Sequence, residues 1–184
     1  MVGFITLEDA KAHLRLDTSD EDALVQRLID AASAKIETAT GYVAVAREQT
    51  FAFDRFERQL ELRLRPIDDE TIEVTYLDGN GDPQTFTDIR AIEKHGTTRI
   101  LPAIGHAWPG AACAAGAVTV TATVGLGETA EAISAVTPEA IKHAARLCVG
   151  HWFANREAVN IGNISTELPL SFADLVEDDR LRRV

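Results

Sequence analysis

The sequence is poor in cysteine, since Cys113 and Cys148 are the only two in 184 residues. Two thiols do not make a disulfide framework, so a disulfide-stapled fold is excluded and two reduced thiols are expected. No stretch approaches the run of about 18 apolar residues that a membrane span requires. The N-terminus lacks a basic segment followed by an apolar one, so no secretory signal is predicted. We therefore expect a protein made in a cytoplasm, without a membrane association.

Basic residues are outnumbered, with 18 Lys and Arg against 29 Asp and Glu, and the formal net charge is −11. A free-standing protein that grips nucleic-acid phosphates or an anionic membrane surface should be basic, so both functions are disfavoured. The excess is uneven: residues 66–136 carry −7, residues 42–65 carry +1 and residues 137–184 carry −1. The apolar share of 46% and the charged share of 26% are ordinary for a globular protein of one domain or two small ones.

Motifs of catalysis and metal binding are also lacking. His143 and His151 lie eight residues apart on one predicted helix, too far to share a metal directly, and Cys148 near them is better explained by packing. The glycines at 125–127 lack the Lys-Ser/Thr of a phosphate loop. Residues 78–89 have part of a calcium-loop rhythm but end in isoleucine instead of glutamate. We predict no enzymatic activity, no cofactor and no metal.

Apolar residues at helical spacing predict three helices. Thr6 and Ser19 are each followed three residues later by aspartate, the pattern of a capping box at a helix N-terminus. Gly41 suits the end of the second helix. Thr137 is expected to cap the third helix, with proline at its first position and its end near residue 155.

Strict alternation of apolar and polar residues predicts strands between the second and third helices. The turn sequence at 78–83 predicts a hairpin. The predicted strands cover residues 50–53, 59–65, 71–77, 84–86, 89–93, 98–101 and 117–124. Helices and strands in separate blocks favour an α+β fold. We predict a small helical bundle from residues 1–41 and 137–156, an inserted antiparallel β block over 42–136, and an extended tail over 157–184 with a short terminal helix.

One stretch of the β block is locally basic and aromatic. Phe51, Phe53 and Phe56 neighbour Arg55 and Arg58. Aromatic and basic residues so interleaved are typical of surfaces for acidic or single-stranded partners. Phenylalanines that fill the core of a strand edge explain the same pattern more simply, and both interpretations stay open.

Two segments of the chain resemble the head–tail connector, or adaptor, proteins of tailed bacteriophages. The first runs from Ile5 to Gly41 and the second from Pro138 to Val159. Residues 74–78 and 118–121 are similar to strands of the longer family members, which carry a β insertion, and residues 167–170 match the tail pattern. The more charged end of the chain departs from that pattern. Phage-derived gene transfer agents use similar proteins.

The resemblance implies a non-enzymatic structural protein at the head–tail interface of a virion, made in the host bacterial cytoplasm. Such proteins assemble as rings of about twelve subunits beneath the portal protein. They extend the DNA channel and offer a docking surface to the stopper or tail protein. DNA passes without sequence-specific binding, and an acidic lining would keep the duplex unbound. A subunit that is monomeric in isolation is compatible with this role.

The resemblance and the amphipathic pattern together suggest two sets of contact residues. The helix faces expected at the subunit interface carry Leu24, Leu28, Trp152 and Arg156. The tail is expected to order itself on the portal. Its proposed portal-binding residues are Leu168, Leu170, Phe172, Leu175, Arg180, Arg182 and Arg183. Deletion of residues 157–184 is then expected to abolish portal binding and to leave the fold intact.

Two other classes of function remain open from the residues alone. One is a small enzyme whose site is assembled from distant carboxylates and histidines. The other is a non-viral binding module that uses the β block. A ring seen by electron microscopy, or portal and capsid genes next to this one, would favour the connector instead.

Overall fold

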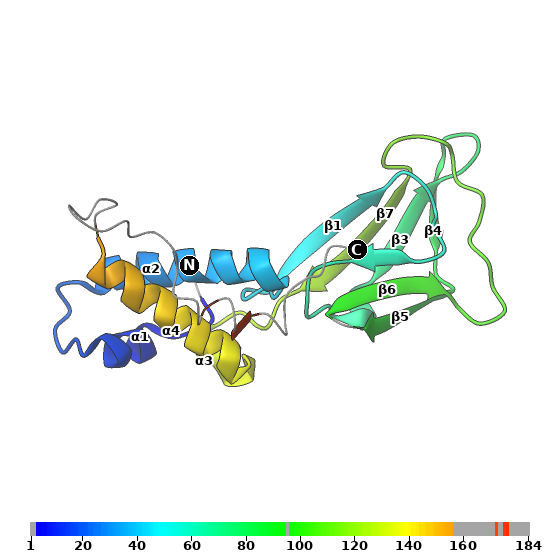
Figure 1. Cartoon of the computed structure of the whole chain (residues 1–184). Coiled ribbons are helices and arrows are strands. Elements are labelled where there is room, and N and C mark those ends of the chain that lie inside the picture. Colours follow the sequence, from blue (N-terminus) through cyan, green and yellow to red (C-terminus); the bar gives the residue numbers. More distant parts are fainter. Residues whose placement is uncertain (1–2, 95, 157–171, 173–174, 177–184) are drawn as a thin grey trace. The chain divides into compact units, whose positions relative to one another are not determined.

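The computed structural model of the chain describes residues 3–94, 96–156, 172, 175 and 176 (Figure 1). The chain divides into two compact units, one from Met1–Val45 with Leu126–Val184 and the other from Ala46–Gly125. We call them the helical unit and the β unit. Separate helical and antiparallel parts confirm the predicted α+β class, with the β segment inserted between helices.

The helical unit contains α1 (Leu7–Leu14), α2 (Asp22–Thr40), α3 (Ala130–Val136) and α4 (Glu139–Ala154). Thr6 caps α1 as predicted, since its hydroxyl accepts the N–H of Asp9 at 3.1 Å. Gly41 ends α2 with φ 72°, and its N–H bonds the Glu37 carbonyl. Glycine adopts this left-handed conformation more readily than other residues, so the sequence predicts this helix end.

The core of the helical unit is built from one face of each helix. Ile29 of α2, Ile133 of α3 and Ile141 of α4 are all buried, together with Phe4 ahead of α1. The N-terminal segment lies so close to α2 that a Cβ at Gly3 would approach Ile29 Cγ2 and Ser33 Oγ to 2.5 Å. Apolar burial at about 25 cal/mol per Å² is the main force that holds such an assembly together.

Two predicted helix starts are wrong. The residue before α2 is Glu21, and the Ser19 carbonyl, not its hydroxyl, accepts the N–H of Asp22. Thr137 does not cap α4, because it ends α3 and its hydroxyl donates to the Ile133 carbonyl at 2.7 Å. The helix α3, with Thr129 as its cap, lies in a stretch that was assigned to the β block. Only Thr137 and Pro138 separate α3 from α4, so a single threonine could be assigned to either helix.

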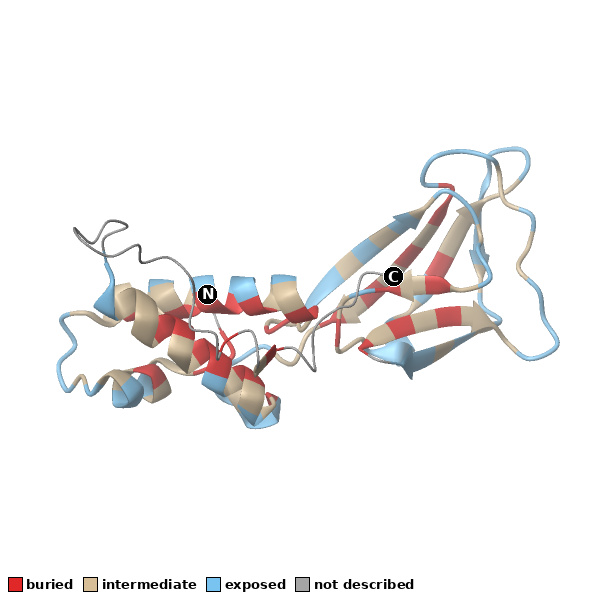
Figure 2. Cartoon of the chain, viewed as in Figure 1, coloured by how far each residue is buried: buried red, intermediate tan, exposed pale blue. Residues whose placement is uncertain are grey.

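The β unit contains two antiparallel sheets, with strand orders β1-β7-β3-β4 and β2-β6-β5. Their strands are β1 (Arg47–Phe53), β2 (Leu60–Leu62), β3 (Glu73–Leu77), β4 (Pro83–Phe86), β5 (Ile89–Lys94), β6 (Thr97–Pro102) and β7 (Val118–Val124). The predicted hairpin at 78–83 joins β3 to β4. Alternate residues of β7 are buried, as strict alternation requires (Figure 2). Two of them, Val118 and Val120, share one core with Leu60, Leu62 and Ile100 of the second sheet.

The second strand is shorter than its alternating pattern predicts. The pattern assigned residues 59–65, with Arg65 on the outward face, but β2 ends at Leu62 and Arg65 is only 8% exposed. The Arg65 guanidinium fills the space over Gly96, where a Cβ would lie 2.4 Å from Arg65 Nη1. A long side chain can bury its stem and guanidinium when a glycine leaves room, which alternation alone does not reveal.

The boundaries between the units fall after Val45 and after Gly125, whereas the β block was predicted over residues 42–136. The Leu126 N–H bonds the carbonyls of Val43 and Ala44 at 3.1 Å, and Val45 bridges to Gly127. These bonds attach both connecting segments to the helical unit. Within the part of the chain that the structure describes, no helix is long and apolar enough to cross a membrane.

Candidate interaction surfaces

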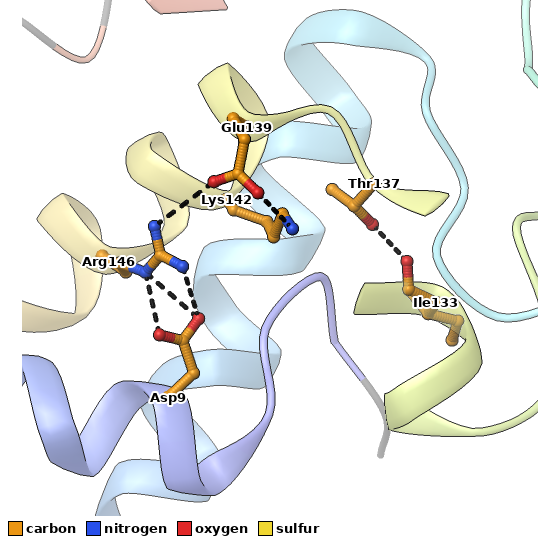
Figure 3. A network of polar contacts seen from close by, with 6 residues as sticks. All are labelled: Asp9, Ile133, Thr137, Glu139, Lys142 and Arg146. Carbon is orange, nitrogen blue, oxygen red and sulfur yellow. Dashed lines mark hydrogen bonds and ion pairs between the residues drawn. The ribbon is translucent and has the colours of Figure 1, made fainter. Parts of the chain in front are cut away.

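A polar network fastens α1 to α4 (Figure 3). The Asp9 carboxylate accepts hydrogen bonds from Arg146 Nε at 3.0 Å and from Arg146 Nη2 at 2.8 Å. Glu139 lies beside the same guanidinium, 3.8 Å from Nη1, and pairs with Lys142. The hydrogen bonds to Asp9 raise the pKa of Arg146 above its ordinary value, because they outweigh the opposite effect of burial. The two-pronged geometry fixes both the distance and the orientation of the two helices.

Loss of this pair should weaken the helical unit modestly. The Arg146 and Asp9 side chains are 24% and 28% exposed, so solvent screens part of their attraction. In a double-mutant cycle of Arg146→Ala and Asp9→Ala, we expect a coupling energy of about 1 kcal/mol by denaturant unfolding. The Lys142→Ala variant, which removes a cation from the same face, is the matched control. A coupling energy near zero would show that the pair is only a surface contact.

The start of α2 and the end of α4 lie together, because Arg156 Nη2 bonds the Glu21 carboxylate. The Arg156 guanidinium also lies 4.5 Å from the centroid of the Phe153 ring. This end of the bundle carries all four predicted interface residues, with Leu24 and Leu28 on α2 and Trp152 on α4. The structure therefore brings residues that are far apart in sequence to one end of the helical unit.

The four predicted interface residues differ in how much surface they offer. Leu28 and Trp152 are half-buried and pack against the core of their own unit. Leu24 is half-buried as well, whereas Arg156 is exposed and paired with Glu21. Much of the apolar surface predicted for a neighbouring subunit is thus already used within the chain.

The C-terminal residues that the structure describes pack onto the chain's own helices. Phe172 and Val176 are 7% and 3% exposed within the core of the helical unit, and Leu175 packs against it. The Lys35 ammonium lies 5.8 Å from the centroid of the Phe172 ring. The remaining predicted portal-binding residues lie outside the described residues: Leu168, Leu170, Arg180, Arg182 and Arg183.

This packing leads us to expect that deletion of residues 157–184 destabilises the helical unit, in contrast to the prediction that the fold stays intact, because the deletion would empty part of the core. Phe172 and Leu175 were predicted as apolar anchors on a partner, whereas Val176 was not predicted. Their spacing fits one face of a short helix, which does not say whether the face covers the chain itself or another protein.

The Cys148 thiol is buried on α4, and burial raises its pKa to about 11 from an ordinary value of 9.0. Cys113 is exposed in the loop between β6 and β7. Because the thiolate is the reactive species, we expect a thiol reagent at pH 8 to modify Cys113 in the folded chain and to modify Cys148 only after unfolding. The unfolded chain releases the Cys148 proton at a lower pH than the folded chain does. The free energy of unfolding is therefore also expected to fall as the pH rises from about 9 to about 11. Equal modification rates for the two thiols would contradict this prediction.

The aromatic and basic stretch of the β unit serves mainly as core. Phe51, Phe53 and Phe56 are half-buried and pack against the buried strands. Phe56 stacks on Trp108 with ring centroids 4.6 Å apart. Arg58 lines a shallow hollow of about 490 Å³ together with Glu57, Gln59 and Arg99. The Glu57 carboxylate offsets part of the positive charge of the two arginines in that hollow. The interpretation of the stretch as core is therefore favoured over its interpretation as a surface for an acidic partner.

Acidic side chains around the 78–83 turn have structural roles. Asp78 Oδ1 accepts the N–H of Asn80 at 2.8 Å and the N–H of Asp82 at 3.1 Å. These backbone hydrogen bonds lower the pKa of Asp78. The side chain thus closes the turn on itself, as aspartate commonly does. Among the described residues, no group of three or more His, Cys, Asp or Glu side chains is placed to hold a metal ion.

Comparison with known proteins decides the family. The family model described as "HCP: Head completion protein" matches residues 3–163. The chain belongs to the head completion protein family. A chain in the virion of a native gene transfer agent particle has the same fold, with a TM-score of 0.74 and 22% identity over 100% of this chain and 94% of that chain. Comparison with curated protein sequences gives no match.

Two structures of the gene transfer agent neck show the same likeness. A chain from the neck of the empty particle, computed with C6 symmetry, matches with a TM-score of 0.71 and 22% identity over 98% of this chain and 91% of that chain. A chain from the neck of the native particle, computed with C12 symmetry, matches with a TM-score of 0.69 and 21% identity over 97% and 89%. Membership of the head completion protein family confirms the predicted resemblance to head–tail connectors, and it places the chain among the structural proteins of virions.

Proposed function

We propose that the chain is a head–tail connector subunit that assembles as a ring beneath the portal, without enzymatic activity. The match of the head completion family model over residues 3–163 carries this proposal. The full-length likeness to a chain in a neck of twelvefold symmetry supports a ring of many copies. A closed ring needs a heterologous interface, in which one face of each subunit meets a different face of the next.

The end of the bundle formed by α2 and α4 is one proposed subunit contact. Arg156 is exposed there, Leu24 is half-buried, and Leu28 and Trp152 pack against the core of their own unit. Arg156 is held toward Glu21 and Phe153, so its guanidinium is already positioned before a neighbour arrives. A preorganised side chain costs less conformational entropy when a contact forms.

The portal contact is proposed for the C-terminal segment. Leu168, Leu170, Arg180, Arg182 and Arg183 remain its candidate residues. Phe172 and Leu175 pack on the chain's own helices, so they anchor the segment to the helical unit unless the portal displaces them.

The acidic charge suits a protein that surrounds moving DNA. The β unit, residues 46–125, has 12 acidic and 8 basic residues. Phosphates are repelled by a net negative lining, so a duplex would pass through the proposed channel without being gripped. The proposed tail-side partner is a stopper or tail protein that docks on the opposite end of the ring.

Electron microscopy of the purified chain mixed with a purified portal tests the proposal. We expect rings of the chain on one end of the portal. A chain that lacks residues 177–184 keeps Phe172 and Val176 but loses the three arginines, so we expect it to remain folded and to bind the portal less well. Portal particles that never acquire added density, at any ratio of the two proteins, would exclude the connector function.

A further inference from the structure

The three-stranded sheet of the β unit has a basic outer side. In the strand register, Ile92 of β5 and Glu61 of β2 both lie beside Arg99 of β6, so these side chains share one side of the sheet. Ile100 alternates to the other side, where it is buried in the core. We call the outer side the basic face; its charged residues are Glu61, Arg63, Arg90, Lys94 and Arg99.

The carboxylates in and next to the basic face already have partners or point elsewhere. Glu61 lies 3.4 Å from Arg99 Nη2, opposite it in the strand register. Asp88 directly precedes β5, and its carboxylate lies 3.3 Å from His106 Nδ1. Glu93 alternates to the other side of β5. The basic face therefore sets four cations against one paired carboxylate, although the whole chain carries a net charge of −11.

An exposed apolar side chain lies among the cations of the basic face. Ile92 is 41% exposed, and the exposed Arg90 and Lys94 lie two residues before and after it on the same side of β5. An apolar side chain inside a rim of charged ones is typical of a protein contact. The phosphates of a nucleic acid would engage the cations alone. Ile92 therefore favours an acidic protein surface as the partner of this face.

The other sheet of the β unit has an acidic outer side. Glu48 of β1 and Glu73 of β3 flank β7 on its outer side, where the side chains of β7 are threonines. The short 3₁₀ helix η1 (Asp69–Thr71) is fixed to the same end of β7, because the Asp68 N–H bonds the Thr123 carbonyl at 3.0 Å. The strand register places no lysine or arginine on this side of the sheet. We call the surface the acidic patch; its residues, all exposed, are Glu48, Asp68, Asp69, Glu70 and Glu73.

The basic face and the acidic patch belong to opposite sides of one unit. Val120 of β7 and Ile100 of β6 share a single core between the two sheets, so the outer sides of the sheets point away from each other. A closed ring requires that two different surfaces of each subunit fit together, and in a ring of many subunits they lie on nearly opposite sides. The chain itself therefore supplies an acidic surface where a neighbour in a ring would need one, and the charges favour a second copy as the partner.

We propose that the basic face of one copy packs against the acidic patch of a second copy. Arg90 and Lys94 then lie against Glu48 and Glu73, and Ile92 packs on the threonines of β7 between the two glutamates. This contact rests on the ring of the proposed function and names one of its subunit interfaces. The opposite charges fix the register of the two copies and speed their encounter, and burial of Ile92 adds the apolar part of the contact.

Reversal and restoration of charge test the contact in the full-length chain. The basic-face variant carries Arg90→Glu and Lys94→Glu, and the acidic-patch variant carries Glu48→Lys and Glu73→Lys. We expect each to lower the fraction of portal particles that carry rings in electron micrographs about tenfold or more, because like charges then face each other. The variant with all four changes should recover that fraction to within about threefold of the wild type, since the two surfaces are complementary again.

Arg15→Glu combined with Arg55→Glu is the matched control. Both residues are exposed and lie outside the two surfaces, and the pair changes the net charge as much as the basic-face variant does. We expect this control to form rings within about threefold of the wild type. A variant with all four changes that forms no more rings than either reversed pair would overturn the contact.

Chemical coupling without the portal separates the contact from the connector function. A carbodiimide joins an amine to a carboxylate that touches it. Mass spectrometry of mixed unlabelled and isotope-labelled wild-type chains should therefore find Lys94 joined to Glu48 or Glu73 of the other copy. If it does while the wild type never forms rings on a portal, the contact stands and the connector function fails. Lys94 joined only to other carboxylates of the second copy would overturn the contact.

Two further outcomes are decisive. Rings that form equally well from the wild type and from both reversed variants would overturn the contact and leave the connector function standing. A basic-face variant that forms normal rings but loses a binding of duplex DNA that the wild type shows would assign the basic face to phosphates instead.

Discussion

Replacement of Phe172 by alanine is expected to lower the free energy of unfolding of the helical unit by about 3 kcal/mol. The Phe172 ring is 7% exposed and belongs to the same core as Ile29 and Ile141. Truncation of a buried phenylalanine removes its transfer free energy and leaves a cavity that the fixed helices fill only in part. Urea unfolding followed by the circular dichroism of the helices measures the change.

Deletion of residues 177–184 is the matched control for Phe172→Ala. It removes the charged end of the chain but keeps Phe172, Leu175 and Val176. We expect a loss below about 1 kcal/mol, because the deletion keeps the three apolar side chains that pack on the helical unit. If both variants unfold like the wild type, the C-terminal anchor contributes nothing to the helical unit, and Phe172 is then available for a partner.

The anchor changes how a portal contact would have to work. A segment whose apolar side chains are already buried gains nothing further from burying them elsewhere, unless the new site binds them more tightly. Phe172 and Val176 are therefore expected to stay packed on the helical bundle, and the residues on either side of them are the ones expected to bind the portal. A stronger effect of the 177–184 deletion than of Phe172→Ala on portal binding would support this division of roles.

Local sequence signals predicted the regular parts of the fold well. The start of α1 at Thr6, the end of α2 at Gly41 and the alternation of β7 each depend on residues near in sequence. Capping hydroxyls, a left-handed glycine and period-two burial act over a few residues, so their outcome can be predicted without the tertiary structure.

The predictions that the structure contradicts concern residues whose environment is set by tertiary contacts. Whether Thr137 ends α3 or begins α4 depends on a competition between two helices for one residue. The burial of Arg65 depends on Gly96, which lies between β5 and β6, and the location of Phe172 depends on the core of the helical unit, which forms only when distant helices pack together. These are tertiary events, and no local pattern reports which surface an amphipathic or long side chain will cover.

The candidate contact surfaces show the same contrast. Leu24, Leu28, Trp152 and Arg156 were predicted from helical periodicity and lie at one end of the bundle, although whether a second subunit covers them stays a prediction. The basic face was missed because its cations lie in separate segments of the sequence, which come together only when β2, β6 and β5 pair. Alternation predicts which side of its own strand a residue occupies, but not which strand lies next to it.

Independent unfolding of the two units is the second large effect that we expect. Ile100 of β6 and Ile141 of α4 are both fully buried, but in cores that share no residue. Isoleucine-to-alanine changes in such cores cost about 3 kcal/mol. Ile100→Ala should therefore weaken the β unit alone, and Ile141→Ala the helical unit alone, as measured by hydrogen exchange of each set of amides.

Excision of the β unit offers a direct check on that independence. The first and last strands of the unit pair with each other, with Arg47 opposite Val124, so residues 46–125 begin and end side by side. A fragment with adjacent ends and its own core should fold alone and unfold cooperatively. In the fragment, Ile100→Ala should cost the same free energy as it does in the whole chain. A single shared transition in the whole chain, shifted equally by Ile100→Ala and Ile141→Ala, would show instead that the two units stabilise each other.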